Sequence, residues 1–216
     1  TFDKHWLTRM VDAIRSHGEC AFWGGRVEPV WQSPVPKWFD PSQCEMLGDT
    51  IVQYRRGETS RAWDAQNDPP FYTANLALRV DAVERAGYFD TNVGHRGSVR
   101  MGMEDSLMVR AIAAGGGKGW YCADATVHHP VPTERMTKRY ARQFARRQGW
   151  LSAQITRDQS PEKKIPRWYY RLAIEKCVAG VGQWFAGLVT LNPARAFAGQ
   201  FVALFNGAKL YHALKK

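Results

Sequence analysis

The sequence predicts a mixed α/β fold, and three observations lead to this prediction. Apolar residues recur at helical spacing in several segments, most clearly after His5, Glu104 and Arg167. Shorter segments between them have the length and the glycine or proline boundaries of strands. Hydrophobic residues make up 44% of the chain and aromatic residues 12%, which excludes a disordered protein and allows a sizeable core in 216 residues.

The first helix is expected over residues 5–17, because its apolar residues fall on one face and Gly18 stops it. Residues 20–31 follow as a strand with a break at Gly24 and Gly25, and such a break often marks the close approach of another backbone or a ligand. Residues 32–70 hold five prolines among polar residues. They predict a long irregular excursion, which inside a domain is usually functional.

Residues 71–79 predict a short strand with Asn75 in its middle, and residues 80–86 a brief helix closed by a glycine. The next helix is expected over residues 104–114, since its apolar side chains repeat at helical spacing until three glycines end the run. Two strands are predicted after it, at 119–122 and 125–129.

Thr133 is the expected cap of a long basic helix that runs to about residue 156. A boundary is predicted near residues 158–161, and two further helices at 167–189 and 193–214. The sequence therefore divides into a main portion, 1–157, and a basic, amphipathic helical extension, 158–216.

The formal charge of +10 is uneven, because much of the excess lies in residues 134–176. Such a block implies an anionic partner: nucleic acid, a phosphate-bearing substrate or an acidic membrane. No nucleic-acid recognition motif is present, so that partner is excluded. The four cysteines are far apart, which disfavours a zinc knuckle or a disulfide framework and suits a reducing compartment. The residues from Thr1 onward show no signal-peptide pattern.

Glu104 and Asp105 follow a glycine-rich, basic loop over residues 92–102 and open a helix. Carboxylates at a helix start most often complement the helix dipole or cap the first turn, and this alternative stays open. The surrounding chain raises the functional alternative, because four features stand in a fixed order. They are Asn75, the acidic pair Glu104 and Asp105, the pair His128 and His129, and the basic helix.

This order resembles the C-terminal half of family 2 glycosyltransferases, which have the GT-A fold and use nucleotide-sugar donors. The resemblance covers about residues 1–150, and its motifs are weak singly but strong in this order and spacing. They are Thr73–Arg79, Ala86–Asp90, Gly102–Arg110 and Ala125–Pro132. The resemblance implies a partial GT-A fold. Residues 2–7 look like the entry to the helix that follows the D-x-D metal motif, so this motif and the donor half are expected upstream of Thr1. The chain alone is then expected to be inactive.

The resemblance implies hexosyl transfer by an inverting single displacement, with Asp105 as the base and Glu104 orienting the site or the acceptor. The glycine-rich loop could close over the acceptor and exclude water. One physical objection stands, because a helix N-terminus stabilises a charged carboxylate and so weakens it as a base. Desolvation or the neighbouring Glu104 would have to oppose that effect.

A divalent metal, Mg or Mn, is also implied, held mostly by the upstream D-x-D and by His129, with His128 as the fallback. A strand-end histidine pair is otherwise more often structural.

Five further residues are candidates for substrate binding. Asn75 could face the donor sugar or satisfy a turn. Arg135 could approach the diphosphate or lie on a solvated helix face. The loop residues His95, Arg96 and Arg100 could touch the acceptor.

The expected acceptor is a cell-surface glycan or a lipid-linked sugar. The C-terminal helices are expected to lie on an anionic membrane surface, which places the protein in the cytoplasm, peripheral on the inner face of the membrane. They could instead pack on the domain or on a partner subunit. A membrane-spanning helix at 167–189 is not expected, because Glu175, Lys176 and Gln183 interrupt it. The alternative function is a non-catalytic binding or membrane-associating module that retains the fold.

Overall fold

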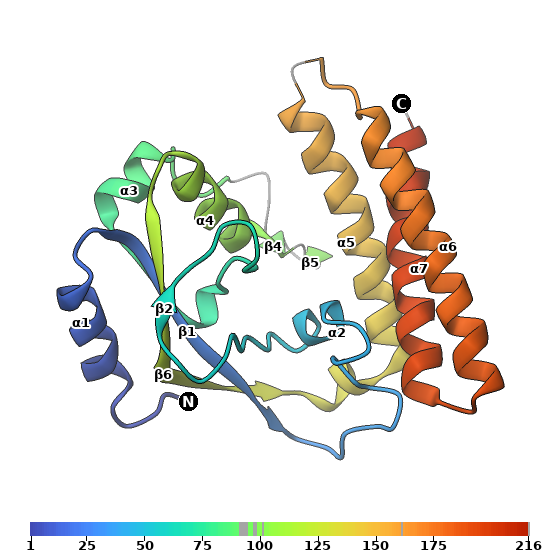
Figure 1. Cartoon of the computed structure of the whole chain (residues 1–216), viewed down its shortest axis with the longest axis horizontal. Helices are drawn as coiled ribbons and strands as arrows, with labels where there is room; N and C mark the ends of the chain where they lie inside the picture. Colours follow the sequence, from blue (N-terminus) through green and yellow to red (C-terminus); the bar gives the residue numbers. More distant parts are fainter. Residues whose placement is uncertain (91–94, 97–98, 101, 161, 216) are drawn as a thin grey trace. The chain divides into compact units, whose positions relative to one another are not determined.

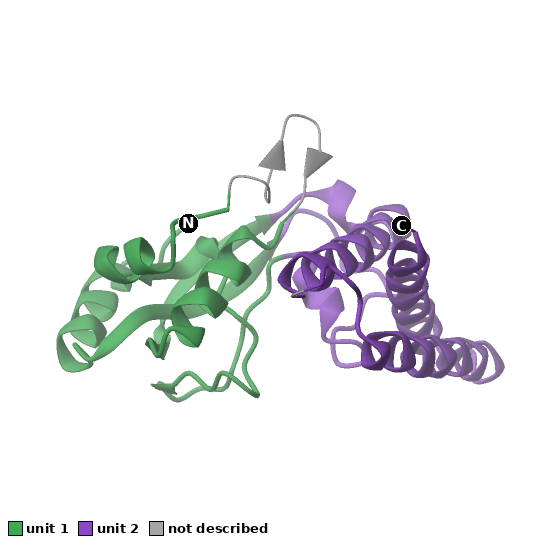
Figure 2. Ribbon diagram, turned by 90° about the horizontal axis from the view of Figure 1, so that it is seen from above, with its two compact units in different colours: residues 1–30, 52–130 green, residues 31–51, 131–216 purple. Residues whose placement is uncertain are grey.

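The computed structural model describes residues 1–90, 95–96, 99–100, 102–160 and 162–215, with residues 95–96 and 99–100 described by their backbone only (Figure 1). The fold is mixed α/β, as predicted. The chain forms two compact units, which are unit 1 (1–30 and 52–130) and unit 2 (31–51 and 131–216) (Figure 2). These units do not coincide with the division into 1–157 and 158–216 that the sequence analysis drew. That division separates the part that resembles a known family from a helical extension, and it stays a prediction.

A four-stranded sheet forms the middle of unit 1, in the order β2–β6–β1–β3. Strand β3 runs antiparallel to β1, with Phe22 opposite Leu78, and β2 runs antiparallel to β6, with Arg61 opposite Tyr121. A separate pair of short strands has His95 opposite Arg100. The bounds are β1 Cys20–Trp31, β2 Arg61–Ala62, β3 Leu76–Leu78, β4 His95–Arg96, β5 Val99–Arg100 and β6 Lys118–Val131.

Helices cover both faces of this sheet (Figure 1). On one face, α1 (Trp6–Ser16) packs Met10 in a cluster with Trp23 of β1 and Cys122 of β6. On the other, α3 (Val80–Arg85) and α4 (Glu104–Ala114) close a larger core around Phe22, Phe71 and Tyr121. Phe22 and Trp23 are neighbours on β1 and enter opposite cores, as the two-residue period of a strand requires.

Two strand predictions in unit 1 were wrong. Residues Thr73–Asn75 form a 3-10 turn instead of the middle of a strand, and only Leu76–Leu78 pair with β1. The two strands predicted at 119–122 and 125–129 are one strand, β6. The strand continues through the expected break. At that place Asp124 O accepts a hydrogen bond from the Arg9 side chain, and Ala125 O accepts one from the Asn75 side chain.

The close approach predicted at Gly24 and Gly25 is confirmed, and protein atoms occupy the space. A Cβ at Gly24 would lie 2.1 Å from the Phe71 ring. A Cβ at Gly25 would lie 2.1 Å from Ala125 O and 2.6 Å from Asn75 Nδ2. Glycine is therefore required here for packing, and the two positions give no evidence of a ligand.

Unit 2 contains four helices, α2 (Met46–Asp49), α5 (Lys138–Gln159), α6 (Arg167–Val189) and α7 (Pro193–Leu214), among its described residues. The last two have the predicted bounds. The cap predicted at Thr133 was wrong, because Thr133–Met136 form a 3-10 turn and α5 starts after it. Thr137 caps α5 by accepting a hydrogen bond from Tyr140 N at 3.2 Å.

Helix α7 supplies the centre of the core of unit 2. Its Phe197 and Phe201 are buried with Trp38 and Leu47 from the irregular excursion and with small residues of α5. The Phe197 and Trp38 ring centroids lie 4.4 Å apart. The aromatic side of this helix was expected at a membrane, but here it packs on protein.

Helix α6 contacts α7 through glycines. A Cβ at Gly187 would lie 2.2 Å from Ala196 N, and a Cβ at Gly180 would lie 2.7 Å from Ala203 N. Gly182, on the same helix, would meet nothing within 4 Å. The two backbones approach closely because these interface positions carry no side chain.

We expect Gly187→Ala to lower the free energy of unfolding by about 1–3 kcal/mol, because the added methyl must displace the α7 backbone. Gly182→Ala is the matched control and is expected to raise it by about 0.5–1 kcal/mol through helix propensity alone. Urea unfolding followed by circular dichroism measures both. Equal changes in the two variants would contradict the packing of α6 on α7.

Candidate active site

The acidic pair stands at an abrupt helix start. Met103 precedes α4 in the left-handed region, with φ 93° and ψ −3°, and its carbonyl accepts the first helical hydrogen bond from Leu107 N at 2.8 Å. A non-glycine residue adopts this backbone conformation at a steric cost, and four others in the described residues do so, Val52, Tyr88, Lys163 and Leu191, so the conformation alone does not mark a functional site. Glu104 and Asp105 then form the first turn of α4, as the sequence predicted.

Asp105 is buried, with 9% of its surface exposed, and joins two segments that are distant in sequence. Its Oδ2 accepts a hydrogen bond from Thr73 N at 3.0 Å, and its Oδ1 accepts one from Ser106 N at 2.7 Å. The bond from Ser106 N agrees with the helix-start alternative, whereas the bond from Thr73 N ties the carboxylate to a separate turn. A hydroxyl also donates to each oxygen at longer range, Thr73 Oγ1 to Oδ2 at 3.5 Å and Ser106 Oγ to Oδ1 at 3.4 Å. Because these two contacts are long, an acceptor hydroxyl can replace either of them.

The same turn contacts the strand that carries the histidine pair. Thr73 is the first residue of the 3-10 turn and binds Asp105, while Asn75 is its last residue and binds Ala125 O of β6. The turn thus connects the start of α4 with β6, three residues before His128. It places these predicted features on adjoining parts of unit 1.

Asn75 is 2% exposed, and its amide is engaged on both sides. Nδ2 donates to Arg26 O at 2.8 Å and to Ala125 O at 2.7 Å, while Oδ1 accepts from Trp6 Nε1 at 2.8 Å. Of the two alternatives drawn from the sequence, this geometry favours a structural side chain over a group that faces the donor sugar. The amide joins α1, β1 and β6.

The histidine pair lies near the end of β6, and both side chains are half-buried. The backbone of His128 pairs with Thr1, through His128 N to Thr1 O at 2.7 Å and the Thr1 ammonium to His128 O at 2.7 Å. Neighbouring side chains on a strand point to opposite faces, so only one of the two histidines can serve a given site. The predicted ligand role of His129 stays a prediction.

The remaining candidates fall into two groups. The side chains of His95, Arg96 and Arg100 lie outside the described residues. Arg135 is half-buried in the 3-10 turn of unit 2, so it belongs to a different unit from the acidic pair.

In the parts of the chain that the structure describes, no three His, Cys, Asp or Glu side chains come together as a metal site. The predicted site takes only one ligand from this chain, His129 or His128, so the metal stays a prediction, and we derive no step through it.

A salt bridge fixes the segment that leads into the Thr73 turn. The Asp68 carboxylate is nearly buried and accepts two hydrogen bonds from the Arg61 guanidinium, at 2.7 and 2.6 Å. Burial alone would raise the pKa of Asp68, but the Arg61 guanidinium and the Asp64 N–H together hold that pKa below its usual value. Two aromatic side chains also donate hydrogen bonds to Pro69 O, Tyr54 through its hydroxyl at 2.9 Å and Trp63 through Nε1 at 3.0 Å.

Thr73 begins one of the motifs named from the sequence, but its contact with Asp105 was not predicted. The contact is made by the backbone N–H of Thr73, which every residue except proline carries. The residue type at position 73 therefore gives no signal of this contact. The contact also joins residues that are 32 positions apart. A tertiary structure was therefore needed to find it.

We expect Thr73→Pro to lower the free energy of unfolding by about 1–3 kcal/mol, because it removes the N–H that binds the buried Asp105 carboxylate. Proline is otherwise tolerated at the first residue of a helical turn, and Tyr72 already has the extended conformation that precedes proline (ψ 146°). Thr73→Ala keeps the N–H and is the control, since the Thr73 hydroxyl lies 3.5 Å from the carboxylate. Chemical unfolding of both variants measures the difference, and an equal loss in the two would contradict this role.

Two curated proteins resemble the chain. One is the glucosyl-dolichyl phosphate glucuronosyltransferase of Haloferax volcanii, 23% identical over 132 residues, which cover 61% of this chain and 40% of that protein. The other is the succinoglycan biosynthesis protein ExoM of Rhizobium meliloti, 27% identical over 136 residues, which cover 62% of this chain and 38% of that protein. The similarity thus spans about two fifths of each relative. No protein-family model and no solved structure matches the chain.

Proposed function

We propose that this chain is the acceptor-side portion of a family 2 glycosyltransferase with a partial GT-A fold. The reaction would move a sugar from a nucleotide-sugar donor to a hydroxyl of a glycan or a lipid-linked acceptor. Synthesis of cell-envelope polysaccharide at the inner face of the membrane is the proposed setting. The mixed α/β fold and the two relatives support this class, since one is named a glucuronosyltransferase and the other a succinoglycan biosynthesis protein.

The observation that carries the proposal is the placement of Asp105. Its carboxylate is buried at the start of α4, each oxygen accepts one fixed N–H, and the next residue toward the N-terminus is a second carboxylate, Glu104. A base needs a held orientation and restricted access of water, and this arrangement supports both. A carboxylate with only a capping role would not need a second anchor from a turn 32 residues away.

In the proposed step, Asp105 takes the proton from the acceptor hydroxyl as its oxygen attacks the anomeric carbon. The bond between that carbon and the diphosphate oxygen breaks, the nucleoside diphosphate leaves with the electron pair, and the anomeric configuration inverts. Glu104 orients the acceptor. Binding of the donor diphosphate is assigned to sequence outside these 216 residues, so the chain alone is expected not to transfer sugar.

The experiment uses the longer protein that contains this chain, with labelled nucleotide sugars and a membrane lipid extract as acceptor. We expect release of nucleoside diphosphate coupled to a labelled glycan or glycolipid whose new bond has the inverted configuration by NMR. A product with retained configuration would exclude the single displacement. Absence of turnover with every donor, together with measurable glycan binding, would instead favour a non-catalytic binding module.

A further inference from the structure

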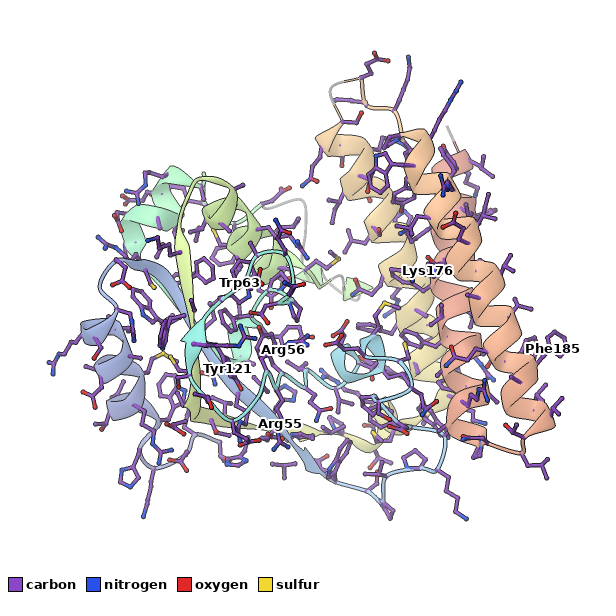
Figure 3. All side chains as sticks on the ribbon, viewed as in Figure 1. Arg55, Arg56, Trp63, Tyr121, Lys176 and Phe185 are labelled. Atoms are coloured by element: carbon purple, nitrogen blue, oxygen red, sulfur yellow. The ribbon has the colours of Figure 1, made fainter. Side chains whose placement is uncertain are left out.

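Helix α6 presents large apolar side chains to the outside of unit 2. The outer face of α6 is defined here by Ile174, Val178, Val181, Phe185 and Leu188, which recur every three or four residues and are all exposed. Figure 3 shows Phe185 pointing away from the neighbouring helices. Soluble proteins rarely expose such a continuous apolar stripe without a partner, so this face marks an interaction surface.

The inner face of the same helix carries small residues along most of its length. Ala173, Gly180 and Gly187 are buried, and the two glycines closely approach the α7 backbone, while Tyr169 in the first turn is the one large buried side chain of the helix. A core helix of a soluble protein directs its large apolar side chains inward, whereas α6 after its first turn buries small residues and exposes large ones. This distribution is typical of helices that face lipid.

Length and composition agree with a lipid environment. Among the helices in the described residues, α6 alone is long and apolar enough to cross a membrane, which the sequence analysis did not expect. Core helices of soluble proteins can pass the same test, but only 17% of the apolar window of α6 is buried. Its partner α7 is held by Phe197 and Phe201 in the core of unit 2, so a spanning α6 would have to leave that packing.

The basic residues beside the outer face favour an anionic lipid surface as its partner. Arg167, Arg171 and Lys176 lie on α6, and Lys163 and Lys164 lie shortly before it, where Lys164 pairs with Glu162 at 2.8 Å. Glu175 is the only acidic residue in the sequence of α6, and Arg171 pairs with it at 2.8 Å. Exposed Trp168 lies next to the basic residues, and aromatic residues beside basic ones favour the headgroup level of a bilayer.

We propose that the outer face of α6 lies flat in the interface of an anionic lipid bilayer, with the basic residues at its N-terminal end on the headgroups. This inference is independent of glycosyl transfer. It assigns membrane contact to α6 alone, because the aromatic side of α7 is buried.

The test compares binding of the 216-residue chain to two kinds of vesicle, pure phosphatidylcholine and phosphatidylcholine mixed with phosphatidylglycerol. The double variant Val178→Glu with Phe185→Glu places two carboxylates on the outer face, at residues that are 66% and 57% exposed. The matched control, Leu7→Glu with Val80→Glu, changes equally exposed helix residues of unit 1, at 65% and 72%. Circular dichroism checks that helix content is unchanged, and Val178→Ser with Phe185→Ser repeats the test without new charge.

We expect the chain to float with the anionic vesicles, less so at high salt, and weakly with pure phosphatidylcholine. The α6 glutamate variant should lose at least about a hundredfold in binding, since two apolar side chains become carboxylates that the surface repels, while the control binds as the parent does. Equal binding by the parent and both α6 variants would overturn the proposal. A parent dimer that these variants dissociate would also overturn the proposal, because the outer face of α6 would then be a protein interface. Resistance to alkaline carbonate extraction would indicate a spanning helix and overturn the flat placement.

Discussion

Replacing Asp105 with asparagine is expected to lower the rate of sugar transfer by about a thousandfold in the longer protein that contains this chain. A positioned general base contributes about two to four powers of ten to a rate, and an amide does not take a proton at neutral pH. Asparagine keeps the size of the side chain but offers one oxygen in place of two, so only one of the N–H groups of Thr73 and Ser106 keeps an acceptor. A loss of stability of about 1–2 kcal/mol is therefore expected as well.

Initial transfer rates and unfolding curves are measured on the same preparations. Asp81→Asn is the matched control, because Asp81 also lies in the first turn of a helix in unit 1, where it pairs with Arg79 and Arg85 on the surface. It should leave the transfer rate unchanged. If Asp105→Asn lost stability but transferred sugar at the parent rate, Asp105 would be a helix-start residue only, and the proposed base would be wrong.

Replacing Asn75 with leucine is expected to lower the free energy of unfolding by about 3–5 kcal/mol, enough to unfold a domain of ordinary stability. Leucine has a similar volume but no polar atoms, so Trp6 Nε1, Arg26 O and Ala125 O each lose a hydrogen-bond partner inside the protein. An unsatisfied buried group costs about 1–3 kcal/mol, and the three losses are not fully additive.

Asn206→Leu is the control for this substitution. Asn206 is also buried, but it lies in α7 and donates one hydrogen bond, to Val202 O at 2.9 Å within its own helix. Val202 O also accepts a backbone hydrogen bond within the helix, so losing the bond from Asn206 should lower the free energy of unfolding by about 1 kcal/mol or less. Urea unfolding of both variants measures the difference. A loss at Asn75 no larger than that at Asn206 would show that the amide does not join α1, β1 and β6 as described.

These two predictions meet at the Thr73–Asn75 turn. Its first residue binds the carboxylate of Asp105, and its last residue holds α1 and β6 together. Damage to the Asn75 contacts is therefore expected to disturb the position of Asp105 as well. Damage to Asp105 should leave the Asn75 contacts in place.

Much of the candidate site could be predicted from the sequence, because its strongest signals are local. The helix that opens on Glu104 and Asp105 was predicted with its observed bounds, since apolar spacing and the glycines that follow it act over a few residues. The same reasoning predicted the bounds of α6 and α7. The sequence left open whether Asn75 faces the donor sugar or satisfies a turn, because its hydrogen-bond partners lie in three segments that are distant in sequence.

The sequence by itself determined which of the longer segments are helical, where the acidic pair stands and that the C-terminal segments are apolar and flanked by basic residues. Only the tertiary structure decided that Thr73 anchors Asp105, that α7 is buried while α6 faces outward, and that Gly25 makes room for Asn75. The physical reason is that helix periodicity and caps depend on neighbours three or four residues away. Burial and backbone contacts depend on whichever distant segment the fold brings close.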